Sequence, residues 1–190
     1  ISSLPRREPA EPGLQWNLLV DTIAETCSSV EEAEQILTSV YHLRSMAYLI
    51  TDSNGRAVVV EAEPGNVKVR RPENGVLIST NHMLGEEDVS ERSRHSRIRY
   101  EHTEGILRER IGEVDETLAE EILSDHHCTI CAGIHGGNPD EIGRREGWGT
   151  IWSTICRPDK RILKVAPGHP CEVGYETIRF EDVSAQSLSR

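Results

Sequence analysis

One short polar segment of the sequence combines residue types that can stabilise a developing negative charge. The apolar strand predicted over Val76–Thr80 leads directly into Asn81 and His82. A side-chain amide at a strand end is a neutral, firmly held hydrogen-bond donor that can be aimed at a developing oxyanion. The alternative is an asparagine in a turn, followed by a solvent-facing histidine. The segment therefore offers Asn81 as a candidate catalytic residue.

A set of four arginines follows within eight positions. Its members are Arg92, Arg94, Arg97 and Arg99. On a helix, Arg94 and Arg97 share one face, and Arg92 and Arg99 share another. Most of the set is expected on a solvated surface beside glutamates. One arginine turned inward toward Asn81 could bind a carboxylate or order a catalytic group, and the spacing does not say which one.

A second cluster has the spacing of a zinc half-site. It contains His126, Cys128, Cys131 and His135, with the two cysteines in a Cys-x-x-Cys pattern. Tetrahedral zinc needs four ligands, which would come from this cluster or from Cys156, Cys171 and His169. The alternative is a short strand in which the cysteines act as small apolar residues.

No residue of this sequence stands out as a nucleophile. Cys27 ends a predicted amphipathic helix, and Gly149–Ser153 reads as a strand. The sequence contains no Gly-x-Ser-x-Gly elbow and no glycine-rich phosphate loop. The residues alone therefore do not name a reaction.

The elements that must position these residues alternate between helices and strands. Apolar spacing predicts helices over 14–27 and 30–40, the second one opened by a capping box from Ser29 to Glu32. Helices are also predicted from Ser90 to Arg110 and after Asp115. Strands are predicted between these helices and after them, separated by turns such as Asn54-Gly55. They cover 46–51, 56–61, 67–70, 76–80, 150–156, 161–165 and 175–180. This order predicts an α+β fold with antiparallel sheets.

Composition and charge restrict the class of protein. The chain has 190 residues and a net charge of −11, which disfavours nucleic acid as a partner. No apolar run is long enough for a transmembrane helix, so no membrane partner is expected. Five cysteines, an odd number, and a start without the features of a signal peptide favour reduced thiols in the cytoplasm.

Several segments together resemble one known family. They are Val60–Ala62, Gly75–His82, Arg94–Arg97, Leu123–His126, Thr129–Cys131, Gly149–Ser153 and Val165–Cys171. The chain resembles, from about Leu14 to Phe180, the acyl-coenzyme A:6-aminopenicillanic acid (isopenicillin N) acyltransferase-like family of autoproteolytic N-terminal-nucleophile (Ntn) cysteine hydrolases. The Thr-Asn-His motif is the most specific element of this resemblance.

The resemblance implies a fold, a reaction and two site residues. The fold is an αββα sandwich, and the reaction is amide or acyl chemistry by an N-terminal cysteine whose own α-amino group acts as the base. The oxyanion asparagine of the family maps onto Asn81. An arginine of a related branch maps onto Arg97, in Ser96-Arg97-Ile98. No cofactor is implied.

The resemblance also implies that part of the active site lies elsewhere. Ile1 falls well inside the family's sequence, none of the five cysteines matches the nucleophile, and Ala132 replaces an arginine that usually follows Cys131. The expected organisation is an irregular lead-in over 1–13, the C-terminal part of one Ntn domain over 14–181, and a tail over 182–190. The chain alone is expected to be inactive.

The expected partners are a small acyl or amide substrate (an acyl-coenzyme A or a peptide) and the missing N-terminal portion of the same protein. Homo-oligomerisation is also compatible with the sequence. Two other functions stay open: a zinc-binding module built on His126, Cys128, Cys131 and His135, and a non-catalytic scaffold of the same fold.

Overall fold

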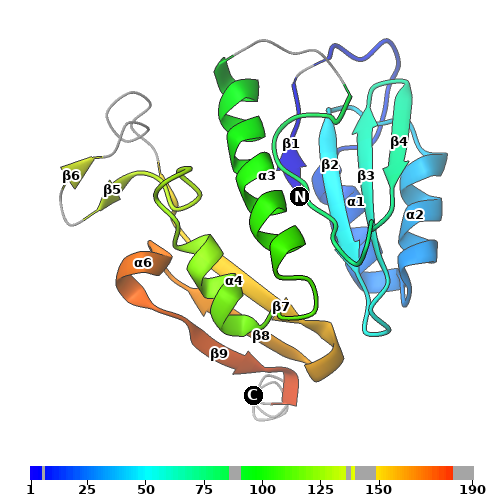
Figure 1. The fold of residues 1–190 in the computed structure, drawn as a ribbon. Helices are drawn as coiled ribbons and strands as arrows, with labels where there is room; N and C mark the ends of the chain where they lie inside the picture. Colours follow the sequence, from blue (N-terminus) through cyan, green and yellow to red (C-terminus); the bar gives the residue numbers. More distant parts are fainter. Residues whose placement is uncertain (6, 86–90, 136–137, 140–148, 182–190) are drawn as a thin grey trace, which may run out of the picture. The chain divides into compact units, whose positions relative to one another are not determined.

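The structure of the chain is a computed structural model that describes residues 1–5, 7–85, 91–135, 138–139 and 149–181. It contains two units, residues 1–109 and residues 110–190. Figure 1 shows the helices and strands of both. The tail predicted over 182–190 lies outside the described residues. The single domain expected over 14–181 stays a prediction, because each unit is described by itself.

An antiparallel sheet with the order β1-β2-β3-β4 organises the first unit. Its strands are β1 (Ser2–Ser3), β2 (Met46–Thr51), β3 (Ala57–Glu63) and β4 (Asn66–Arg70). β2 and β3 form the predicted hairpin, with Met46 opposite Ala62 and Thr51 opposite Ala57. Gly55 supplies the positive φ of 77° that its turn requires. The sequence therefore predicted the centre of this sheet correctly.

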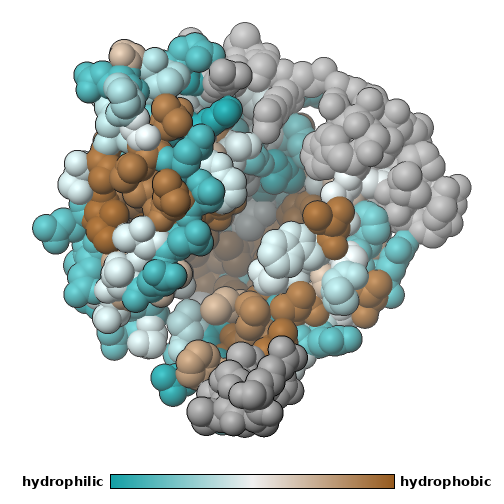
Figure 2. Space-filling view, turned by 180° about the vertical axis from the view of Figure 1, so that it is seen from behind, coloured by the Kyte–Doolittle hydropathy of each residue, from teal (hydrophilic) through white to brown (hydrophobic). Residues whose placement is uncertain are grey.

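Helices α1 (Trp16–Thr26) and α2 (Val30–Ser39) pack on one face of this sheet. Alternate residues of the strands meet the apolar stripes of the helices, as their periodicities require. The shared core contains Leu19, Val30, Leu37, Met46, Tyr48, Val58, Val60 and Ala62. Apolar side chains also reach the surface at Trp16 and Leu18 of α1. Figure 2 shows brown patches on this side of the unit.

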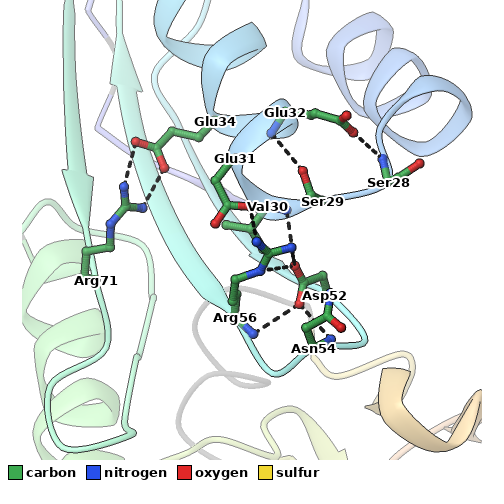
Figure 3. A network of polar contacts seen from close by, with 10 residues as sticks. All are labelled: Ser28, Ser29, Val30, Glu31, Glu32, Glu34, Asp52, Asn54, Arg56 and Arg71. Carbon is green, nitrogen blue, oxygen red and sulfur yellow. Dashed lines mark hydrogen bonds and ion pairs between the residues drawn. The ribbon is translucent and has the colours of Figure 1, made fainter.

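Polar contacts at the ends of α2 fix its position, as Figure 3 shows. The Glu32 backbone N–H donates to the hydroxyl of Ser29 at 3.3 Å, which confirms the predicted capping box. The carboxylate of Glu32 accepts from the N–H of Ser28 at 2.6 Å. In a standard capping box it would accept from the N–H of the N-cap residue, Ser29. On the other side, Arg71 makes a two-pronged bond to Glu34 at 2.6 and 2.9 Å.

The second face of the sheet carries buried polar side chains. Glu61 and Glu63 of β3 are each only 1% exposed. Arg70 donates from Nε to Oε1 of Glu61 at 2.8 Å, and Arg7 lies 3.0 Å from Glu63. Burial of a carboxylate is tolerated only with such a partner. These ion pairs therefore determine what can pack on this face.

The strand predicted over Val76–Thr80 is not formed. Asn74 and Gly75, with φ values of 51° and 80°, make a turn that leaves only one isolated bridge, between Glu73 and Val76. Side chains take the place of a strand ladder here, because the Ile78 carbonyl accepts from the guanidinium of Arg70 at 2.9 Å. The segment that leads to Asn81 is therefore held by side-chain bonds.

The lead-in over 1–13 was expected to be irregular, but a short part of it forms a strand. Ser2 and Ser3 form β1 and pair with Ala47 and Met46 at the edge of β2. Pro5 cannot donate a backbone hydrogen bond, so a longer ladder is disfavoured. Next to this strand, Leu4 packs with Ala47 and Met83 in a small core on the second face of the sheet.

The second unit contains a smaller sheet and short helices. The sheet has the order β7-β8-β9, from β7 (Ser153–Arg157), β8 (Ile162–Ala166) and β9 (Glu176–Arg179). α4 (Glu116–Leu123) begins at Asp115, whose carboxylate accepts from the Leu118 N–H at 2.9 Å, as predicted. Lys164 of β8 binds Glu120 of α4. β5 (Ile134–His135), β6 (Asn138–Pro139) and α6 (Pro170–Val173) complete the unit.

Antiparallel sheets and separate helices confirm the α+β class. α3 (Glu91–Glu109) is the longest helix of the described residues and closely matches the prediction of 90–110. It is highly polar, and within the described part of the chain no helix is long and apolar enough to cross a bilayer.

Candidate active site

The side chain of Asn81 is fixed at both ends of its amide. Its Nδ2 donates to the backbone carbonyl of Ser3 at 3.1 Å. Its Oδ1 accepts from Nη2 of Arg99, on α3, at 2.8 Å. The side chain is half-buried, and the amide nitrogen carries two hydrogens. Only one of them has a protein acceptor among the described residues, the carbonyl of Ser3.

Ser96 of α3 holds the backbone around Asn81. The hydroxyl of Ser96 is fully buried and accepts from the Asn81 backbone N–H at 2.7 Å. It donates to the hydroxyl of Thr80 at 2.9 Å and lies 2.8 Å from Nδ1 of His82. Three consecutive residues thus converge on one serine, and the orientation of Asn81 depends on it.

His82 is buried and does not face solvent, so that alternative expectation is wrong. It is 7% exposed, and its ring packs edge-on against Tyr100 of α3 with the centroids 5.7 Å apart. Nδ1 of His82 also lies 3.1 Å from the hydroxyl of Thr80. The histidine therefore belongs to the same network as Ser96 and helps to lock the segment against α3.

Arg99 is the arginine that turns toward Asn81. Burial lowers the pKa of its guanidinium, and its Nε has no hydrogen-bond partner in the described part of the protein. None of the described carboxylates forms an ion pair with it. The cation instead points one N–H at a neutral amide oxygen, which makes Arg99 a positioning residue for Asn81.

The other arginines of the set have different surroundings. Arg97 lies in the wall of a cavity of about 410 Å³, together with His82, Met83 and Tyr100. Its role in catalysis stays a prediction, since it makes no described bond to Asn81. Arg94 is exposed, and the side chain of Arg92 lies outside the described residues. The sequence did contain a signal for Arg99, because Ser96 and Arg99 stand three positions apart and share one face of α3.

Removing the Ser96 hydroxyl is expected to destabilise the first unit by about 1–3 kcal/mol, because the Asn81 N–H and Thr80 hydroxyl lose a buried partner. The variant is Ser96→Ala, measured by urea unfolding. Ser39→Ala is the control, because it removes an exposed hydroxyl that donates to the Ile36 carbonyl within α2. Equal losses for the two variants would contradict the role of Ser96.

The zinc cluster of the sequence analysis is only partly assembled. His126 and Cys131 come together, but the third side chain within 4.8 Å is Cys171, and Cys128 is not part of this group. The side chain of His135 lies outside the described residues. Burial raises the pKa of the Cys131 thiol to about 11. Cys131 is therefore a poor nucleophile at neutral pH.

A comparison with protein families shows to which family the chain belongs. The model of the family described as acyl-coenzyme A:6-aminopenicillanic acid acyl-transferase matches residues 1–172. The chain belongs to this acyltransferase family. No curated protein matches the chain.

Membership of the acyl-coenzyme A:6-aminopenicillanic acid acyl-transferase family confirms the resemblance stated from the sequence. The match includes Asn81, Arg97 and Arg99, and it extends through both units to Glu172. The family indicates acyl-transfer or Ntn-type hydrolase chemistry in general.

Proposed function

We propose that this chain supplies the oxyanion-stabilising part of an Ntn-type cysteine amidohydrolase or acyltransferase, with Asn81 as the donor. The observation that carries the proposal is the fixed amide of Asn81, held by Ser3 at one end and by Arg99 at the other. A donor that is already oriented does not have to reorganise when charge develops on the substrate. The remaining N–H of Nδ2 is the group that would bind the oxyanion.

The position of Arg99 favours this role. Its guanidinium withdraws electron density from Oδ1 of Asn81, and this polarisation makes the N–H groups of the same amide stronger donors. Because the cation is buried, water screens its effect only weakly. A lysine would not reproduce this arrangement, since it lacks the planar guanidinium that is oriented against the amide.

The proposal takes the attacking thiol from outside these 190 residues. The cysteine branch of Ntn chemistry uses a cysteine at a new N-terminus, released by self-cleavage, whose α-amino group acts as the base. The five cysteines of the chain do not match the family's nucleophile. The corresponding fold is the αββα sandwich, to which the sheet and helices of the first unit would contribute.

The cavity lined by Arg97 and His82 is the proposed place for the acyl group or the acceptor. Its volume of about 410 Å³ suits a small ligand, and its wall combines Met83, Leu84 and Tyr100 with charged groups. Arg97 would orient a carboxylate or thioester there. The family's name points to acyl-coenzyme A donors, and a peptide amide is the second donor class.

The test is a search for a covalent acyl intermediate on the complete polypeptide that contains these residues. The protein is mixed with short- and medium-chain acyl-coenzyme A thioesters and with N-acyl amides, and its intact mass is measured after a rapid acid quench. We expect a mass increase equal to one acyl group, together with release of coenzyme A or amine. If no donor of either class gives an adduct or a product, the proposal is wrong and the non-catalytic scaffold is favoured.

A further inference from the structure

Three side chains that commonly bind transition metals converge in the second unit, and a fourth, His169, lies beside one of them. His126 and Cys131 lie in the segment that follows α4, whereas His169 and Cys171 lie at the start of α6. One ligand atom each of His126, Cys131 and Cys171 lies within 4.8 Å of the other two. Nδ1 of His169 lies 3.8 Å from Sγ of Cys131. The mechanism proposed at Asn81 uses none of these residues.

Two separations, both from the sulfur of Cys131, are close to those around one tetrahedral zinc ion, whereas His169 lies outside the group of three and would have to turn toward the ion. With Zn–S bonds of about 2.3 Å and Zn–N bonds of about 2.0–2.1 Å, tetrahedral geometry places two sulfurs about 3.8 Å apart and a sulfur and a nitrogen about 3.5 Å apart. The observed distance between the sulfurs of Cys131 and Cys171 is 3.6 Å. The 3.8 Å between Cys131 and His169 is slightly longer than the sulfur–nitrogen separation of this geometry. The two thiols are not joined in a disulfide.

Backbone bonds hold both ligand-bearing segments. The N–H of Cys131 donates to the carbonyl of Asp125 at 2.9 Å, and the next residue, Ala132, bonds to Thr150 through both its N–H and its carbonyl. On the other segment, the carbonyl of His169 accepts from the N–H groups of Glu172 and Val173 at 2.9 and 3.1 Å. The backbone around both cysteines is thus already shaped before a metal arrives.

Exposure of the ligands gives a metal ion a way in. Cys131 is fully buried, but His126 and Cys171 are exposed. An ion would therefore enter from solvent between two accessible ligands and complete its shell on the buried thiol. This combination of one anchored ligand and an open path is what a metal site requires.

The second unit also has a small apolar core that a metal would reinforce. The buried apolar residues described in it are only Leu118, Ile122, Cys131, Ala132, Ile155, Ala166 and Pro170. Small units with a core of this size are commonly stabilised by a disulfide or a structural metal. A metal bound here would tie the segment after α4 to the segment after β8, about 40 residues later in the chain.

We propose that His126, Cys131, His169 and Cys171 bind one structural Zn²⁺ ion. With His169 turned toward the ion as the fourth ligand, the four protein ligands would close the tetrahedral shell and leave no position for a reacting water, so the role is structural. This set differs from the cluster read from the sequence, since Cys171 and His169 replace Cys128 and His135. The site is independent of Asn81, so its test does not depend on catalysis.

The test is metal content and cobalt spectroscopy of the complete chain. The protein is purified under reducing conditions without a metal-affinity tag, treated with chelator, and titrated with Zn²⁺ or Co²⁺. We expect about one zinc ion per chain. Bound Co²⁺ should show the visible bands of a tetrahedral site and a thiolate charge-transfer band. Cys131→Ser and Cys171→Ser should lower the affinity at least about tenfold.

Cys128→Ser and Cys156→Ser are the matched controls and should bind zinc as the unmodified chain does. If Cys131→Ser does not fold, Cys171→Ser and His126→Asn carry the test, because both positions are exposed. The proposal is overturned if the reduced chain takes up no metal. It is also overturned if Cys128→Ser loses zinc as completely as Cys171→Ser, or if a Cys131–Cys171 disulfide accounts for both thiols in a metal-free protein.

Discussion

Replacing Asn81 with alanine is expected to slow acyl-enzyme formation in the complete protein by about two to three orders of magnitude. The reason is that Asn81→Ala removes the oriented N–H that would donate to the tetrahedral oxyanion. An oxyanion donor typically lowers the activation free energy by about 3–4 kcal/mol. The loss should appear in the rate of acylation, measured by rapid-quench mass spectrometry. The substrate KM should change much less, because the donor acts mainly on the transition state.

Two comparisons separate catalysis from stability in this variant. Asn17→Ala makes the same chemical change on the exposed face of α1 and should leave acylation unchanged. Asn81→Ala also removes the partner of Arg99 and of the Ser3 carbonyl, so its unfolding free energy is measured in parallel. Acylation at the normal rate by a folded Asn81→Ala protein would show that Asn81 is not the oxyanion donor.

Features of the fold that depend on residues close together in the sequence were predicted correctly. Local signals worked well: Ser29 caps α2, Asp115 caps α4, and Gly55 closes the hairpin of β2 and β3. Each of these depends on residues within a few positions, so a pattern in the sequence is sufficient. Family membership, which confirmed the resemblance, depended on several such segments in a fixed order.

Features that depend on distant pairing were missed. β1 forms because the edge of β2 is available to Ser2 and Ser3, more than forty residues away in the sequence. Residues 76–80 are apolar like a strand, yet their backbone is bound by Arg70 rather than by a neighbouring strand. No periodicity in the segment itself can indicate this, because the partner is a side chain of β4.

In the candidate site, too, the features determined by nearby residues were predicted, whereas those that depend on distant contacts were missed. Asn81 was identified by its residue type and by its place after an apolar run, both local properties. The choice among the arginines depends on how α3 is turned against residues 80–82, and this is fixed by the buried bonds of Ser96. In the second unit, Cys171 and His169 were named as further ligands. Only the fold brings them, and not Cys128, to Cys131.

Arg70 connects the buried face of the sheet to the segment that presents Asn81. Its Nε donates to Glu61, which is 1% exposed, and its Nη2 donates to the Ile78 carbonyl, three residues before Asn81. The second carboxylate oxygen of Glu61 has no other partner among the described residues. Arg70 is therefore the only described cation that compensates this carboxylate.

Arg70→Met is expected to lower the free energy of unfolding by about 3–5 kcal/mol, because it leaves the Glu61 carboxylate buried without its counter-charge. Arg71→Met is the matched control: Arg71 is the next residue, is exposed, and pairs with Glu34 on the surface, so its loss should cost about 1 kcal/mol or less.

Adding Glu61→Leu to Arg70→Met should recover most of the stability, since both buried polar partners are then gone. Urea unfolding of the unmodified chain, Arg70→Met, Glu61→Leu and the doubly substituted protein gives the coupling between the two residues. If Arg70→Met costs no more than Arg71→Met, the ion pair does not support this face of the sheet. If the doubly substituted protein is stable but acylates slowly, the bond from Arg70 to Ile78 is needed to hold Asn81 in place.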